Sequence, residues 1–164
     1  MKSYLLVFFF LTITLSTAQN FIGKGDKKLQ VGTSLQDNAS SIMVTYDIGL
    51  GENISVGVYS AYALGVNSDI DADFGDRFDV RARFNANIGN VLNIDDNFDF
   101  YPGLNLGLRN FGGHVGARYF FTDGFGIFSE IMIPIARYDT GDLTAAEEVN
   151  NQFMFNLGVT FNLN

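Results

Sequence analysis

The sequence predicts an all-β protein, folded as an eight-stranded antiparallel up-and-down transmembrane β-barrel. Its last stretch, Gln152 to Asn164, alternates strictly, because every odd position from Phe153 onward is large and apolar and the even positions are mostly small or polar. Earlier stretches repeat this alternation, and a secretory signal precedes them. Together these observations indicate that the apolar faces meet lipid and that the strands close into a barrel.

Residues 1–18 are predicted to be a signal peptide. Lys2 is followed by an apolar run from Tyr4 to Leu15 and by the small residues Ser16 and Ala18. The run is shorter than the ~20 apolar residues of a membrane-spanning helix. Cleavage after Ala18 would leave one domain, residues 19–164, with 164 minus 18, or 146, residues.

Composition excludes several functional classes. Without Lys2 the chain has 9 Lys plus Arg against 18 Asp plus Glu, a formal charge of about −9, which disfavours binding to nucleic acid. It has no cysteine, so a lipoprotein anchor and disulfide bonds are impossible. The 18 Gly and 2 Pro are typical of strands joined by tight turns.

Four strands are predicted in the N-terminal half, after a polar leader at Asn20 to Lys27. The first two are separated by a D-N-A-S turn, the third follows a short G-E-N turn, and an acidic loop precedes the fourth. In the fourth strand an apolar face alternates with Asp, Arg and Asn, which cannot face lipid. The strands are Lys28 to Leu35, Ile42 to Leu50, Ile54 to Val66 and Arg77 to Ile88, and the connections are Asp37 to Ser40, Gly51 to Asn53 and Asn67 to Asp76.

Four more strands are predicted in the C-terminal half. The Asp-Gly pair at Asp123 readily adopts hairpin geometry, and Pro134 is expected to mark a bulge because it lacks a ladder donor. The strands are Phe98 to Asn110, His114 to Phe121, Phe125 to Tyr138 and the final stretch, and the connections are Gly89 to Asn97, Phe111 to Gly113, Thr122 to Gly124 and Asp139 to Asn151.

An even number of strands puts both chain ends on one side, where turns are short, while the longer loops lie on the other side. This topology places a set of aromatic residues at the periplasmic level, as expected for an interfacial girdle. The set is Phe98, Phe100, Tyr101, Tyr119, Phe121, Phe125 and Phe161.

Four segments resemble a known family: L-Q-V-G-T-S-L-Q-D-N, Y-D-I-G-L-G-E-N-I-S-V-G, Y-P-G-L-N-L-G-L-R-N-F-G and G-A-R-Y-F-F-T-D-G-F-G. The family is that of small eight-stranded outer-membrane β-barrel proteins of Gram-negative bacteria without an assigned function. The resemblance covers nearly all of the mature chain. It implies the barrel and carries over no catalytic or binding residue.

Charged residues are predicted on the inward faces. They are Lys28, Asp47, Asp79, Arg81, Arg83, Arg109, Arg118 and Glu130. The interior of an eight-stranded barrel is only wide enough for side chains, so these groups are expected to pair and fill it. The alternative is a narrow conduit or small-ligand pocket lined by arginine.

His114 is the single histidine. It belongs to the inward set of the strand His114 to Phe121, but it lies beside an external Gly-Gly turn and is therefore expected at the surface. No nucleophile motif lies near it, so the sequence predicts no enzyme and no cofactor. The acidic loop spaces Asp69, Asp71, Asp73 and Asp76 like the start of a calcium loop, but its glycine is at the seventh position and Val80 replaces the closing glutamate. The loop is therefore either solvated or a weak cation site that bridges to lipopolysaccharide phosphates.

We expect a monomeric barrel of the outer membrane with a plugged lumen and a structural or surface-interaction role, whose partners are outer-membrane lipid and lipopolysaccharide. The alternative is a narrow transporter or binding barrel for small solutes, including apolar ones. A soluble lipocalin-like carrier is disfavoured, because inward charges would occupy its ligand cavity.

Overall fold

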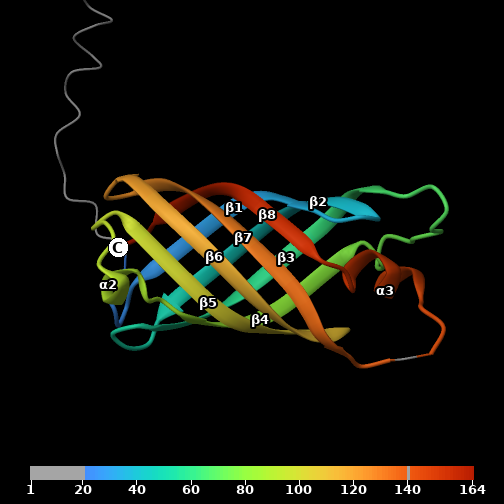
Figure 1. The fold of residues 1–164 in the computed structure, drawn as a ribbon. Coiled ribbons are helices and arrows are strands. Elements are labelled where there is room, and N and C mark those ends of the chain that lie inside the picture. Colours follow the sequence, from blue (N-terminus) through green and yellow to red (C-terminus); the bar gives the residue numbers. More distant parts are fainter. Residues whose placement is uncertain (1–20, 140) are drawn as a thin grey trace, which may run out of the picture.

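The computed structural model describes residues 21–139 and 141–164, which form a closed barrel with strand order β1 to β8 (Figure 1). The strands are β1 Lys27–Leu35, β2 Ala39–Gly49, β3 Ile54–Val66, β4 Phe78–Ala86, β5 Phe98–Gly107, β6 Asn110–Thr122, β7 Phe125–Arg137 and β8 Met154–Asn162. Each neighbouring pair is antiparallel, and β1 pairs with β8 to close the sheet. This confirms the predicted fold class. The predicted signal peptide lies outside the described residues.

The two ends of the barrel differ. The turn end carries the short β2–β3 and β6–β7 connections, helix α2 (Gly89–Leu92) and the C-terminus, and the loop end carries the β3–β4 loop and helix α3 (Ala145–Asn150) (Figure 1). Both helices lie where the sequence analysis expected connections. The T-x-x-E sequence at Thr144 to Glu147 forms a capping box and was the available indication of α3. No helix in the described part of the chain is long and apolar enough to cross a membrane.

Alternation sets which side chains enter the lumen. In β2 every second residue from Ala39 to Gly49 is buried, and the residues between them are exposed. Met43 and Asp47 therefore point inward, while Ile42 and Val44 point outward and are 52% and 42% exposed. The outer wall is apolar along all eight described strands, and the lumen is largely polar.

The predicted turn at Phe111 to Gly113 is wrong. These residues are part of β6, where Phe111 pairs with Leu106, and the chain turns earlier, at Leu108 and Arg109. Instead, the absence of a side chain at Gly112 lets neighbouring groups of the barrel approach its backbone closely. A Cβ on Gly112 would come within 2.7 Å of the Ile133 carbonyl oxygen. The predicted bulge in β7 is confirmed, since Phe111 pairs with Ala136 but Gly112 pairs with Pro134.

Aromatic rings form a series on the outer wall near the turn end. Their centroids are 5.7 Å apart for Tyr119 and Phe121, 6.3 Å for Phe121 and Phe125, and 5.7 Å for Phe125 and Phe161. Tyr101, which was predicted for the same girdle, is fully buried in the lumen instead. Side chains alternate along β5, so Tyr101 points to the opposite side of the sheet from Phe98 and Phe100.

Candidate functional site

The candidate site is the lumen, together with its mouth at the loop end. Within the described residues, nine charged side chains are at most 3% exposed and line the lumen: Asp26, Lys28, Asp47, Asp79, Arg81, Arg83, Asp99, Arg118 and Glu130. Seven of them were predicted from the sequence. The other two, Asp26 and Asp99, were not predicted. Asp26 lies before β1. Asp99 is the second residue of β5, and its inward direction could have been predicted because Phe98 before it points outward.

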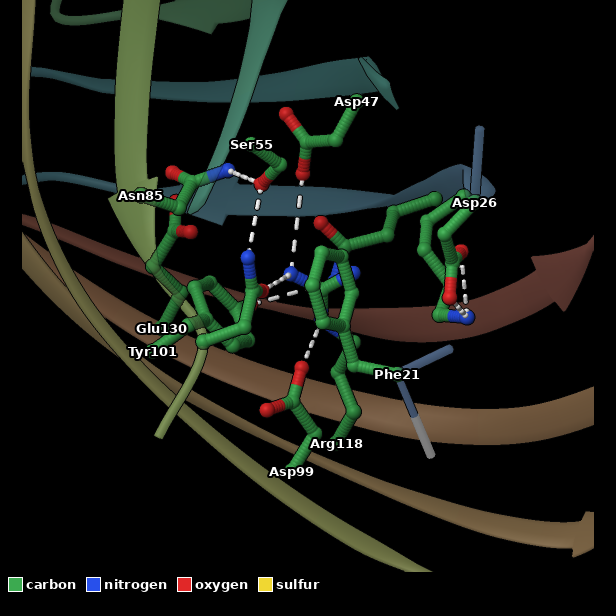
Figure 2. Close-up of polar contacts among 12 residues, drawn as sticks. Phe21, Asp26, Asp47, Ser55, Asn85, Asp99, Tyr101, Arg118 and Glu130 are labelled. Carbon is green, nitrogen blue, oxygen red and sulfur yellow. Dashed lines mark hydrogen bonds and ion pairs between the residues drawn. The ribbon is translucent and has the colours of Figure 1, made fainter. Parts of the chain in front are cut away.

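A central cluster consists of Asp47, Arg83, Asp99, Arg118 and Glu130. Figure 2 shows its four labelled members Asp47, Asp99, Arg118 and Glu130. Arg83 Nη2 lies 2.6 Å from Glu130 Oε2, and Arg83 Nε lies 3.2 Å from Asp47 Oδ1. Arg118 is 3.6 Å from both Asp47 and Asp99. Asp47 therefore joins the two arginines, and the cluster links β2, β4, β5, β6 and β7 across the lumen.

The ring of Tyr101 lies near the guanidinium groups of both arginines. The Arg118 guanidinium lies 3.9 Å from the centroid of the Tyr101 ring, and that of Arg83 lies 5.8 Å from it. Gly116 provides the space for this ring, because a Cβ there would come within 2.2 Å of it. The Tyr101 ring thus occupies the space that a side chain at position 116 would otherwise fill.

His114 adjoins the central cluster and is 2% exposed. The predicted inward direction of its side chain is confirmed, and the predicted surface position is wrong. The physical reason is that β6 begins four residues before it. Its Nε2 lies 2.8 Å from Asn85 Oδ1 and 3.4 Å from Arg83 Nη2. Asn85 in turn donates to Ser55 Oγ at 3.0 Å. On the other side of the ring, His114 Nδ1 lies 3.5 Å from Asn105 Nδ2.

A separate ion pair lies toward the turn end. Lys28 Nζ is 2.6 Å from Asp26 Oδ1 and 5.2 Å from the centroid of the Phe120 ring. Asp26 Oδ2 accepts a hydrogen bond from the Ile22 amide at 2.7 Å, and Phe21 is 4% exposed. The segment before β1 therefore enters the lumen, where Figure 2 places Phe21 and Asp26.

Arg81 connects the lumen to α3 at the loop end. Its Nε lies 2.6 Å from Asp79 Oδ2, and its Nη2 donates to the Asn150 carbonyl oxygen at 2.8 Å. Val149 on α3 is fully buried and packs against Ala39 and Ala63. The carbonyl end of the helix is thus bound to the wall of the barrel.

An apolar lumen cluster lies between Arg81 and the central cluster. It consists of Met43, Tyr59, Ala61, Phe128, Met132 and Met154. The Met154 sulfur is 3.8 Å from Arg81 Nη2, and the Met132 sulfur is 3.1 Å from Asn156 Nδ2, whose amide also reaches Glu130. This cluster was not predicted from the sequence.

Arg109 and the acidic loop lie outside the lumen clusters. Arg109 does not join the lumen charges: it lies in the β5–β6 turn, is half-buried, and donates to the Phe78 carbonyl oxygen at 3.1 Å. Of the acidic loop, the Asp73 amide donates to Asp76 Oδ2 at 3.0 Å, and Asp69 is exposed. In the described ranges, no three His, Cys, Asp or Glu side chains come together in a way that could hold a metal ion.

A cavity of about 580 Å³ opens at the loop end, between the β1–β2 turn, the β3–β4 loop and the α3 segment. Asp69 lines it together with Asp37, Arg137, Glu148 and Asn151. Asn151 is 1% exposed and its Nδ2 has no hydrogen-bond partner in the part of the chain described.

Comparison with known proteins supports the fold. A model described as a family of unknown function (DUF6646) matches residues 10–163. A solved structure from work described as "De novo design of transmembrane beta-barrels" is similar, with a TM-score of 0.54 and 9% identity over 85% of this chain and 97% of that chain. No curated protein matches the sequence. The structural likeness extends to an all-β closed barrel.

Proposed function

This chain belongs to the DUF6646 family of unknown function, and from that premise we propose that it is a non-enzymatic outer-membrane barrel with a plugged lumen. It is monomeric, surrounded by lipid and lipopolysaccharide, and it acts as a structural or surface-interaction protein. The observation that carries the proposal is the distribution of side chains, with paired charges inside the barrel and a predominantly apolar outer wall.

The apolar wall supports a membrane location. Val58, Leu106 and Ile133 are 51%, 57% and 53% exposed on the outer face, and such area costs roughly 25 cal/mol per Å² in water. Hydrocarbon removes this cost. The ring series from Tyr119 to Phe161 fits a girdle at one interface, with the turn end in the periplasm.

The lumen contacts support the plug. The central cluster crosses the barrel, Phe21 and the Lys28–Asp26 pair occupy the turn end, and α3 lies over the loop end. Breaking a buried pair leaves a charge without a partner, at a cost of ~3–5 kcal/mol. Because an unpaired charge would be this costly, the charged groups stay paired across the lumen and keep it filled. The external loops are then the part of the protein that meets partners.

Two measurements test the proposal. The mature chain should fold in vesicles or detergent and migrate differently on a denaturing gel before and after boiling, whereas recovery as a soluble periplasmic protein would exclude the membrane location. In planar bilayers the purified barrel should give no steady current. Steady ohmic channels would refute the plug.

The apolar lumen cluster favours a second candidate, a narrow transporter or binding barrel for small apolar solutes. Its methionine and aromatic side chains can repack around a guest more easily than branched side chains can. Vesicles containing the barrel would then take up an apolar solute faster than empty ones, and Ala61→Phe would abolish the difference. Equal uptake by vesicles with and without the barrel would exclude the transporter and favour the structural role.

A further inference from the structure

The β3–β4 loop is bound to the barrel on its inner side, at the loop end (Figure 1). Ala72 packs against the buried cluster that contains Val149 of α3. Arg77 Nε donates to the Ala72 carbonyl oxygen at 3.1 Å and so closes the loop on itself. Asn150 Nδ2 of α3 donates to the Asp76 carbonyl oxygen at 2.8 Å. These contacts fix the backbone of the loop against the rim of the barrel.

Phe74 lies on the other, outer side of the same loop. It is 79% exposed, and its ring centroid is 5.2 Å from that of Tyr62, which points outward from β3. Tyr62 pairs with Phe78 at the start of β4, and Leu64 lies two residues further along the same face of β3. Phe78 and Leu64 are 43% and 62% exposed. We call Tyr62, Leu64, Phe74 and Phe78 the loop-end apolar patch.

The loop-end apolar patch continues the outer wall at the level where β3 would leave hydrocarbon. Tyr62 is the ninth residue of β3, counted from Ile54 at the turn end, and a tilted strand crosses the hydrocarbon in ~9–11 residues. The ring series from Tyr119 to Phe161 lies near the turn end, so the patch is one strand length away from it. Aromatic side chains favour both interfaces of a bilayer.

The charge of the loop is kept away from this patch. Asp69 lines the cavity between the loops, together with Asp37 and Glu148, on the side of the rim that faces α3. Phe74 lies on the outward face of β3 instead. The loop therefore has an acidic inner side toward water and an aromatic outer side, which is the arrangement of a segment that lies at a lipid surface.

We propose that the β3–β4 loop docks on the lipid surface through the loop-end apolar patch, with the Phe74 ring in the headgroup region. In water the exposed patch would cost free energy that contact with lipid removes. The ring is already held by Tyr62 and the backbone by its inner contacts, so docking orders little further. The inference rests on the proposed function for the membrane location, and it makes this loop a lipid contact.

A single tryptophan at the patch tests the proposal, because the chain itself has none. The mature barrel with Phe74→Trp is placed in nanodiscs, where both of its ends face bulk water. Their phosphatidylcholine carries bromine, a contact quencher, at a shallow or a deep position of the acyl chains. We expect shallow bromine to reduce the emission by at least about twofold, and more than deep bromine does. Tyr62→Trp reads the same patch independently and should show the same order.

Two matched variants calibrate the depth. Leu157→Trp on the outer wall, near the middle of β8, should be quenched more by deep bromine than by shallow bromine. Asp69→Trp belongs to the same loop as Phe74 but lines the cavity on the inner side. Its emission should respond to acrylamide in the water and to bromine at neither depth.

The outcomes separate this inference from the membrane location. If Phe74→Trp is quenched by acrylamide as strongly as Asp69→Trp, and by bromine at neither depth, the patch faces water or a protein partner and the inference is overturned. Quenching of Leu157→Trp in that experiment would leave the membrane location intact. If bromine quenches none of the variants, the membrane location is refuted and the lipid contact with it.

Discussion

Replacing Arg83 by methionine should destabilise the barrel by about 4 kcal/mol. Arg83 contacts Glu130 at 2.6 Å and Asp47 at 3.2 Å, and all three side chains are at most 1% exposed. Removal of one partner from a buried pair costs ~3–5 kcal/mol, because the other charge remains buried. Asp47 keeps Arg118 at 3.6 Å, whereas Glu130 keeps the neutral Asn156 amide at 3.1 Å, so most of the cost comes from Glu130.

Urea unfolding of the barrel in phospholipid vesicles measures this cost. The chain has 7 tyrosines and no tryptophan, so tyrosine fluorescence reports the transition. The double variant Arg83→Met/Glu130→Gln should recover part of the loss, with a coupling of about 0.5–3 kcal/mol. A loss below about 1 kcal/mol in the single variant, or simple additivity in the double one, would show that the pair is not buried in the lumen as described.

Three further perturbations test other parts of the structure. Leu157→Arg on the outer wall should cost ~2–4 kcal/mol in vesicle-unfolding experiments if the residue meets hydrocarbon near the midplane, and an unchanged midpoint would place it elsewhere. Gly116→Ala should cost ~1–3 kcal/mol because its Cβ meets the Tyr101 ring, and the additional truncation Tyr101→Ala should remove that increment. Arg81→Gln removes the contact of Nη2 with the Asn150 carbonyl oxygen, so limited proteolysis should cleave next to α3 several times faster; an unchanged rate would show that Arg81 does not secure the helix.

The sequence by itself determined the architecture and the direction of most side chains. Strand alternation has a period of two and is a local property, so Asp79, Arg81 and Arg83 could be placed inward from their spacing alone. Outward residues such as Leu157 followed from the same alternation. A bulge at Pro134 was equally predictable, because the missing donor is a property of one residue.

Only the tertiary structure decided which inward groups meet. His114 and Arg109 were misplaced because the β5–β6 turn was expected at glycines that instead allow close packing inside β6. Asp26 pairs with Lys28 because the segment before β1 enters the lumen, and Asp47 joins Arg83 to Arg118 across strands that are distant in sequence. Alternation along one strand determines whether a side chain points into the lumen or toward the outside. Which side chains meet across the lumen depends on strand register and on closure of the barrel, and both arise only when all eight strands pair.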